Sequence, residues 1–288
     1  MGRDTIFVLT IFGQYLFLHL DMTFAFHHSQ DTYFQYQLET TRQYILPFLR
    51  KYMTFQPGMR VLEVGCAQGG VLKAFLDEGC IGTGVELHEG NYNQAKRFLA
   101  KELENDTCRI FHKNIYDPKI AEEFASHFDL IVLKDVVEHI PDTLKLLKTL
   151  HSFLRPNGRI FFGFPPWQMP FGGHQQGCKG IAGVLPWVHI LPNMLYLNLY
   201  RLLGQSEQMI AELADVKSTR ITIERFERSA KSSGLTIIGK TLWLINPIYS
   251  LKFNLQPREQ LPLLRDMPYV RNFYTTCGYY LIGPSKPA

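Results

Sequence analysis

Short apolar runs alternate with amphipathic stretches as far as residue 164. The apolar runs lie at residues 61–64, 82–86, 109–113, 129–133 and 159–164. Their composition is typical of strands buried on both faces of a sheet. Stretches with helical spacing separate them, at residues 65–78, 91–104, 120–126 and 143–154. This regular alternation predicts right-handed crossovers and therefore a parallel sheet.

The alternation ends at Pro165-Pro166. Residues 165–219 are rich in Pro, Gly, His and aromatic side chains, and we interpret them as an insertion that forms a substrate lid. The rest of the chain is expected to contain a helix at 221–232, a strand at 235–245, a second insertion at 246–272 and a strand at 274–282. Two late strands without a helical crossover predict an antiparallel pair at the sheet edge. The predicted fold is a doubly wound α/β fold with three layers, α/β/α, around a mostly parallel seven-stranded sheet.

The N-terminal residues form a region of their own in this prediction. Residues 35–52 have helical spacing, so residues 1–56 are expected to pack an apolar segment and a helix on the core, and residues 57–288 form the main domain. The uncharged apolar run at 6–20 is shorter than the roughly 20 residues that cross a bilayer. It could pack on its own domain, precede a natural start at Met22, or make a weak membrane-surface contact.

Composition narrows the class of protein. Of the 288 residues, 46% are hydrophobic and 19% are charged, which favours a well-filled core over disorder. The formal net charge is +4 without a run of Lys or Arg, so no nucleic-acid partner is expected. Five widely spaced cysteines form no CxxC pair, which favours a reducing, cytoplasmic location. Nothing in the sequence specifies an oligomeric state.

A glycine-rich turn joins the first predicted strand to the following helix. Residues 61–70 read VLEVGCAQGG, and such a turn lets a ligand approach the backbone at the N-terminus of a helix. The dinucleotide pattern G-x-G-x-x-G fits imperfectly, because Ala67 takes the place of the second glycine. Glu63, two residues before Gly65, can meet a cationic part of a ligand. Glu86 ends the next strand, where an acidic residue binds both hydroxyls of a ribose.

These residues resemble the first motifs of class I S-adenosylmethionine-dependent methyltransferases. Residues 63–69 (EVGCAQG) are similar to the acidic-x-Gly-x-Gly-x-Gly motif, and residues 85–87 (VEL) are similar to the second motif. Residues 113–115 (KNI) match the third motif, in which an acidic residue often faces the adenine amino group. Asn114 departs from that pattern, but its amide oxygen can accept the same hydrogen bond.

Two further segments extend the resemblance. Residues 128–139 are similar to the fourth-strand motif, and residues 154–159 resemble the turn before the fifth strand, so the motifs cover residues 57–165 in the expected order. The resemblance implies that S-adenosyl-L-methionine is the cofactor. The cofactor-binding residues that it implies are Glu63, Gly65, Cys66, Ala67, Gly69, Glu86, Leu87, Asn114, Ile115 and Lys134.

Polar residues follow the fourth strand, where an acceptor would meet the methyl donor. Asp135 and His139 are the predicted catalytic residues, with the His139 imidazole as a general base. Asp135-x-x-Glu138-His139 is also similar to the Glu-x-x-Glu-His cluster of small-RNA 2′-O-methyltransferases and ubiquinone-pathway O-methyltransferases, which helps to hold a divalent metal. His174 or His189 could then supply a further ligand. Alternatively, Glu138 and His139 cap the following helix and line the pocket floor, and we assign no metal ligand from sequence.

The predicted lid bears on the nature of the acceptor. Gly172-Gly173-His174 could form a mobile tip that faces the pocket. Residues 181–200 are uncharged and apolar, although prolines and asparagines argue against a membrane span. They could cover a small core, or they could join residues 6–20 in a surface for a lipidic or lipid-linked substrate.

The sequence therefore predicts an S-adenosylmethionine-dependent methyltransferase. It would transfer a methyl group to an oxygen, less readily to a nitrogen or carbon, of an unidentified small-molecule or lipid-linked substrate. A non-catalytic S-adenosylmethionine-binding module is one alternative, and a metal-assisted O-methyltransferase that uses Asp135, Glu138 and His139 is another. A nicotinamide oxidoreductase is disfavoured by Ala67 and Glu63.

Overall fold

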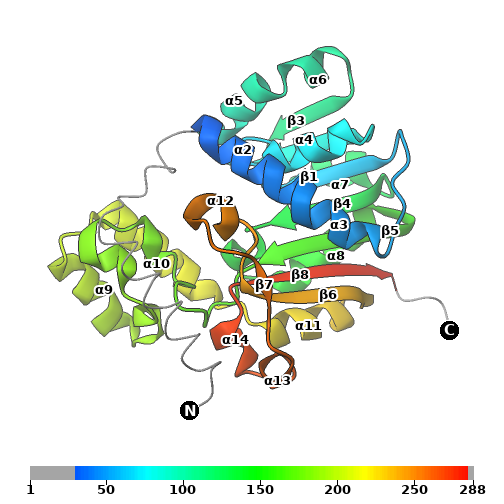
Figure 1. Cartoon of the computed structure of the whole chain (residues 1–288). Coiled ribbons are helices and arrows are strands. Elements are labelled where there is room, and N and C mark those ends of the chain that lie inside the picture. The colour runs from blue at the N-terminus through cyan, green and yellow to red at the C-terminus, as the bar shows by residue number, and fades with distance from the viewer. Residues whose placement is uncertain (1–29, 285–288) are drawn as a thin grey trace.

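One twisted sheet with helices on both faces organises the chain (Figure 1). The computed structural model describes residues 30–284. The predictions for the apolar run at 6–20 and for a natural start at Met22 lie outside these residues.

Within the described residues, eight strands form the sheet in the order β3-β2-β1-β4-β5-β8-β6-β7. The strands are β1 (Arg60–Val64), β2 (Ile81–Glu86), β3 (Cys108–His112), β4 (Phe128–Lys134), β5 (Leu154–Phe164), β6 (Leu235–Ile245), β7 (Arg258–Glu259) and β8 (Cys277–Pro284). Neighbouring strands from β3 to β5 are parallel, whereas β8 pairs antiparallel with β5 and β6. The α/β fold with an antiparallel edge is confirmed. The predicted number of seven strands is one too low, because two-residue β7 is too short to leave a periodic pattern.

The helices cover both faces of this sheet. The α-helices are α2 (Gln30–Thr40), α3 (Leu46–Arg50), α4 (Gly70–Asp77), α5 (Glu89–Phe98), α6 (Ala100–Glu104), α7 (Pro118–Phe124), α8 (Thr143–Phe153), α9 (Asn193–Leu202), α10 (Glu207–Thr219), α11 (Ile223–Ser232), α12 (Tyr249–Phe253), α13 (Pro262–Arg265) and α14 (Arg271–Tyr274). A π-helical turn, η2 (Thr41–Ile45), joins α2 to α3, and short 3₁₀ turns lie at η3 (Val137–His139), η4 (Gln175–Gly177), η5 (Gly180–Val184) and η6 (Val188–Ile190).

Two apolar clusters hold the three layers together. On one face, α7, α8 and α11 bury residues such as Phe124 and Phe226 against the sheet. On the other, α2, α3 and α4 bury residues such as Phe34 and Phe75. Full burial of one such side chain contributes about 1.5–3 kcal/mol. The two clusters fix the sheet, and with it the loops at the carboxyl ends of its strands.

The N-terminal helix is longer than predicted and contains a π-helical turn. The helical spacing indicated residues 35–52, whereas the structure is helical from Gln30 to Arg50. Pro47 has no N–H and cannot donate to the carbonyl of residue 43, and the π-helical turn directly before α3 accommodates this. The result is a continuous helical segment that lies across the N-terminal end of α4.

Both predicted insertions contain helices. The predicted lid, residues 165–219, holds α9 and α10, and the second insertion, residues 246–272, holds α12, α13 and the edge strand β7. Ser206 begins α10 by accepting a hydrogen bond from the Met209 N–H, a cap that the proline- and glycine-rich composition around it obscured. β5 also begins earlier than expected, at Leu154 rather than 159, because residues 154–158 join the sheet through a register shift. No helix within residues 30–284 is long and apolar enough to cross a membrane.

Candidate functional site

The predicted site residues lie at or just beyond the carboxyl ends of β1, β2, β3 and β4. Strand order reverses between β1 and β4, and a ligand in an open α/β sheet binds outside such a point. The loops that follow these strands therefore form the candidate site.

The glycine turn after β1 depends on backbone conformations that side chains resist. Gly65 and Gly69 have φ angles of 69° and 85°. A Cβ atom at Gly65 would lie 2.7 Å from Val136 Cγ2, and one at Gly69 would lie 2.7 Å from Leu99 Cδ1. Ala67, in place of the middle glycine, also adopts a positive φ of 47°. The turn is thus fixed by its neighbours before any ligand binds.

Glu86 closes this turn from the end of β2. Its Oε2 accepts a hydrogen bond from the Ala67 N–H at 2.8 Å, and its Oε1 accepts one from the His88 N–H at 2.7 Å. Each carboxylate oxygen retains capacity for a second donor. This position suits a ribose, and the binding role of Glu86 stays a prediction.

The side chain of Glu63 is buried more deeply in the protein than binding to a ligand requires. Its side chain is only 2% exposed, and its Oε2 accepts a hydrogen bond from the Leu72 N–H at 2.9 Å. Burial raises the pKa of Glu63 well above its usual range. In this arrangement Glu63 ties β1 to α4, and contact with a cationic ligand group stays a prediction. Cys66 is likewise fully buried in the turn.

Three further residues predicted to bind the cofactor are divided between surface and core. Leu87 is 66% exposed, and its carbonyl lies 3.0 Å from His112 Nε2. Asn114 is exposed, and its Oδ1 accepts a hydrogen bond from the Tyr116 N–H at 3.0 Å. Ile115 is buried in the core. Leu87 and Asn114 can flank a ligand, whereas Ile115 positions the loop.

Lys134 and Asp135 form an ion pair at the end of β4. Burial alone would lower the pKa of Lys134, but the charge of Asp135 outweighs it and raises that pKa. Burial would raise the pKa of Asp135, and Lys134 reverses the effect and lowers it. Asp135 therefore stays ionised and is a weak base. Its φ of 55° turns the chain away from the sheet into η3.

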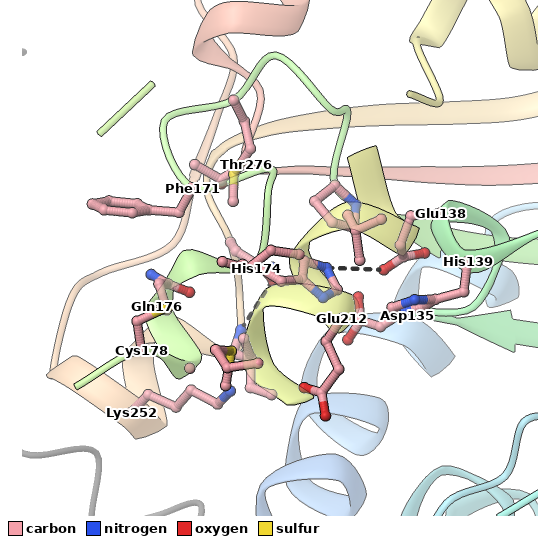
Figure 2. Close-up of a pocket in the computed structure, with 18 of the residues that line it drawn as sticks. Asp135, Glu138, His139, Phe171, His174, Gln176, Cys178, Glu212, Lys252 and Thr276 are labelled. Atoms are coloured by element: carbon pink, nitrogen blue, oxygen red, sulfur yellow. Dashed lines mark hydrogen bonds and ion pairs between the residues drawn. The ribbon is translucent and has the colours of Figure 1, made fainter. Parts of the chain in front are cut away.

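Glu138, His139 and His174 come together beyond this turn (Figure 2). One ligand atom from each lies within 4.8 Å of the others, and Glu138 Oε1 is 4.0 Å from His174 Nε2. Glu138 is 3% exposed, and neither of its carboxyl oxygens has a hydrogen-bond partner in the described part of the chain. Burial and nearby Asp135 raise the pKa of Glu138. Loss of water lowers the pKa of His139 and brings that of His174 to about 4, so both imidazoles are neutral.

Two alternatives for this cluster are corrected by the geometry. Glu138 and His139 do not cap the following helix, because the Asp142 side chain accepts the hydrogen bond from the Lys145 N–H and caps α8. His189 does not join the cluster, because its Nε2 lies 2.7 Å from the Trp167 carbonyl and its ring is fully buried in the lid. His174, from the predicted lid tip, is the histidine that approaches Glu138.

One cavity of about 1210 Å³ connects these features. It extends from His88 and Asn91, after β2, past Asp135 and the histidine cluster to the lid. The lid side is mainly apolar, with walls formed by Met169, Phe171, Ile181, Val184, Met209, Leu213, Val216, Ile248 and Tyr249. The cavity thus has a polar floor and an apolar roof, with room for more than one small molecule.

Two lining residues carry no motif and were missed by the sequence analysis. Tyr33 reaches the cavity from α2, where burial raises the pKa of its hydroxyl and the Gln37 side chain hydrogen-bonds to it. Lys252 enters from α12. The sequence signal for Tyr33 is its spacing from Gln37. The two residues are four positions apart, so they lie on the same side of a helix and place polar groups within its apolar face. Lys252 left no signal in its proline-rich surroundings.

Comparison with known proteins identifies this arrangement. The sequence model of a family described as "Methyltransferase domain" matches residues 33–172, which include β1 to β5 and the loops that follow β1, β2 and β4. This match confirms the predicted class I S-adenosylmethionine-dependent methyltransferase domain in that part of the chain. A ubiquinone biosynthesis O-methyltransferase of Coxiella burnetii is 29% identical over 117 residues, 41% of this chain and 47% of that protein. A protein of the same name from Acinetobacter baylyi is 27% identical over 105 residues, 36% and 43% of the two chains. The chain thus spans about half the length of the curated relatives that it matches.

Solved structures have a fold similar to that of this chain. A geranyl diphosphate C-methyltransferase of Streptomyces coelicolor superposes with a TM-score of 0.53 at 12% identity, covering 83% of this chain and 78% of that one. A phosphoethanolamine N-methyltransferase of Haemonchus contortus superposes with a TM-score of 0.53 at 16% identity, covering 91% and 59%. At these identities the likeness concerns the fold alone.

Proposed function

We propose that this chain is an S-adenosylmethionine-dependent O-methyltransferase acting on a hydroxyl group of a small or lipid-linked molecule. The observation that carries the proposal is the cluster of Glu138, His139 and His174 in the cavity, next to the loops that the class uses for its methyl donor. A hydroxyl needs a group that takes or withdraws its proton, and this cluster offers neutral imidazoles for that purpose. The names of the two curated relatives support oxygen as the acceptor atom.

The donor side of the cavity fits S-adenosylmethionine. In this proposal Glu86 would bind the ribose, Asn114 and Leu87 would flank the adenine, and the turn at 65–70 would allow the ligand to approach the backbone closely. S-adenosylmethionine supplies an electrophilic methyl group, so transfer breaks an S–C bond, forms an O–C bond and releases a proton. The chain has to orient the acceptor oxygen and receive that proton. His139 is the proposed base, and the ionised Asp135 and Lys134 pair holds the β4 end in place.

A divalent cation fits the cluster and is a second candidate component. The buried carboxyl of Glu138 has two unpartnered oxygens, and two neutral imidazoles face it, which is a donor set that transition-metal ions accept. Glu138, His139 and His174 would hold the ion, and Asp135 would remain with Lys134. The ion would lower the pKa of a bound hydroxyl. A cation would also stabilise the ionised form of Glu138, which burial otherwise disfavours.

Methyl transfer to catechol as a general hydroxyl probe tests the proposal. We expect S-adenosylhomocysteine to form, and His139→Ala to lower its rate about 100-fold or more without weakening cofactor binding. Incubation with EDTA separates the two modes, since only the metal-assisted mode loses activity that Mg²⁺ or Zn²⁺ restores. Full activity after both EDTA treatment and His139→Ala would contradict a role for the cluster.

A lipid-linked acceptor is supported by exposed apolar side chains on the lid. Leu191, Met194, Leu195 and Leu202 lie on or beside α9 and are 40%, 74%, 56% and 86% exposed. Figure 1 shows α9 at the end of the molecule away from the sheet. Apolar residues in such a position can dip into the interface of a bilayer. Co-sedimentation with phosphatidylglycerol vesicles should fall when Met194, Leu195 and Leu202 are replaced by Gln; equal pelleting of both proteins would contradict the contact.

The five cysteines support a reducing compartment. All five are free and buried. Buried thiols are unreactive, and cysteines remain free of disulfides in a reducing compartment. We therefore propose a cytoplasmic location for the reaction.

A further inference from the structure

The two halves of the histidine cluster come from loops that are far apart in the sequence. Glu138 and His139 lie in η3, after β4, whereas His174 lies at the tip of the lid. Figure 2 shows the side chains of Glu138 and His174 directed toward each other. The ring centres of His139 and His174 are 4.9 Å apart. Two side chains in the last turn of α10 connect these loops.

Thr219 ends α10 and holds the η3 side of the cluster. Its side chain is buried, and its hydroxyl donates toward the carbonyl oxygens of Glu138 and Val216, the latter at 2.9 Å. Arg225 adds a second link, since its guanidinium donates hydrogen bonds to the carbonyl oxygens of Thr219 and Pro141, the latter at 2.7 Å. Because these contacts reach the backbone within η3 and directly after it, they fix where η3 lies relative to α10.

Lys217, two residues earlier on α10, holds the lid side of the cluster. Its side chain is buried, and its ammonium group donates hydrogen bonds to the carbonyl oxygens of His189, at 2.6 Å, and Leu191. The ammonium group also lies 4.7 Å from the centre of the Tyr196 ring, whose face attracts a cation. A buried charge needs such contacts in place of water, so the turn at 189–191 is tied firmly to α10.

A buried pair of side chains extends this attachment to His174. His189 Nε2 lies 2.7 Å from the Trp167 carbonyl oxygen and therefore carries the ring hydrogen, which leaves Nδ1 to accept a hydrogen bond from Gln175 Nε2 at 3.3 Å. One tautomer of the neutral imidazole satisfies both contacts. The Gln175 amide also donates to the Pro170 carbonyl oxygen at 3.0 Å. Because Gln175 directly follows His174, these contacts hold the backbone of the lid tip, where His174 has a φ of 58°.

We propose that Lys217 and Thr219 are positioning residues that set the separation between the two halves of the cluster. The inference rests on the proposed O-methyltransferase function, which takes its proton acceptor from this cluster. Residues two positions apart on a helix point to different sides of it, so one can hold the lid while the other holds η3. A displacement of one half by about 1 Å would impair methyl transfer, because the reacting groups must meet within narrow limits. The lid tip is then a fixed part of the site, in place of the mobile tip that its two glycines suggested.

Nuclear magnetic resonance of the full chain with isotope-labelled histidine rings measures this separation. We expect a nuclear Overhauser effect (NOE) between the ring protons of His139 and His174 in the wild-type protein. The NOE falls with the sixth power of the distance, so a displacement of about 1 Å from the present 4.9 Å would lower it about threefold. Thr219→Val and Lys217→Met should each show such a loss. Thr219→Ser, which keeps the hydroxyl, should retain the wild-type intensity.

Ser233→Ala is the control for these variants. It removes a buried hydroxyl that donates to the Ala230 carbonyl oxygen at 2.8 Å, at the end of α11 and outside the residues that line the cavity. The NOE should not change in this control, and an equal loss there would overturn the proposal by showing general loosening. Absence of the NOE from the wild-type protein would also overturn it. Full intensity in Thr219→Val overturns the assignment of Thr219, and full intensity in Lys217→Met overturns that of Lys217.

Methyl transfer to catechol by the same proteins separates this inference from the proposed function. We expect Thr219→Val to lower kcat about tenfold or more with little change in the KM for S-adenosylmethionine, and Thr219→Ser to restore the rate. An NOE that weakens while kcat stays unchanged would overturn the positioning role. If the wild-type protein forms no S-adenosylhomocysteine but the NOE responds as expected, the proposed function is contradicted and the structural link through α10 is supported.

Discussion

Gly65, Ala67 and Gly69 all have positive φ angles, and two of the three are glycines. Ala67 carries a methyl group in place of the middle glycine, so the motif tolerates a small side chain at this position. At Gly65 and Gly69, Val136 and Leu99 leave no space for a side chain. The same pattern of glycines is thus set by two causes, backbone conformation and lack of room. Substitutions at glycines with and without close neighbours can separate these two causes.

Gly69→Ala should destabilise the protein more than Gly204→Ala. Both glycines have a positive φ, 85° and 72°, but a Cβ at Gly69 would meet Leu99 whereas nothing lies within 4 Å at Gly204. The conformational cost alone is about 1–2 kcal/mol. Crowding in a packed core adds about 1–3 kcal/mol at Gly69. Urea denaturation measures the difference, and equal losses in the two variants would show that the turn relaxes freely.

His189 should make the protein sensitive to mild acid. Burial lowers its pKa to about 4, so the ring is neutral when folded and gains a proton on unfolding below about pH 6.5. The unfolded state then binds more protons, so the contribution is complete above pH 6.5 and falls between pH 6.5 and 4, by up to about 3 kcal/mol. In His189→Gln this part of the loss should disappear. Parallel pH profiles of unfolding free energy for both proteins would contradict the assignment.

At the scale of elements, α2 forms part of the candidate site. The helix lies on the first turn of α4, so close that a Cβ atom at Gly70 would be 2.4 Å from the Phe34 carbonyl oxygen. It also brings Tyr33 into the cavity. The segment before the first strand therefore covers the glycine turn as well as the core. Neither the contact nor its closeness is visible in the spacing of residues 35–52.

Gly70→Ala should loosen this contact. The added methyl group meets backbone, which cannot rotate away, so we expect a loss of about 1–3 kcal/mol from crowding. Gly90→Ala is the matched control, because Gly90 is also helical and its Cβ would meet only the exposed ring of His88. The control should be neutral or slightly stabilising, since alanine favours helix by about 1 kcal/mol. Urea denaturation of both variants decides, and a stable Gly70→Ala protein would mean that α2 is free to move.

At the scale of the whole molecule, the structure of the alternating part could be predicted from sequence, whereas the helices of the insertions could not. The strands β1, β2 and β4 are largely buried, whereas the edge strand β3 is buried only in part, and the turns after these strands carry the class motifs. The lid helices α9 and α10 depend on packing of Tyr196 and Tyr200 against α10, which no local pattern reveals. The approach of His174 to Glu138 is equally non-local, so the sequence offered His174 and His189 as equivalent and only the fold distinguished them.

The central claim is that the pocket after β1 and β2 binds S-adenosylmethionine rather than a dinucleotide. Calorimetric titration of the full chain with S-adenosylhomocysteine and, separately, with NADH tests it most directly. We expect measurable one-to-one binding of S-adenosylhomocysteine and no heat of binding with NADH at the same concentrations. Binding of NADH alone, or of neither compound, would contradict it.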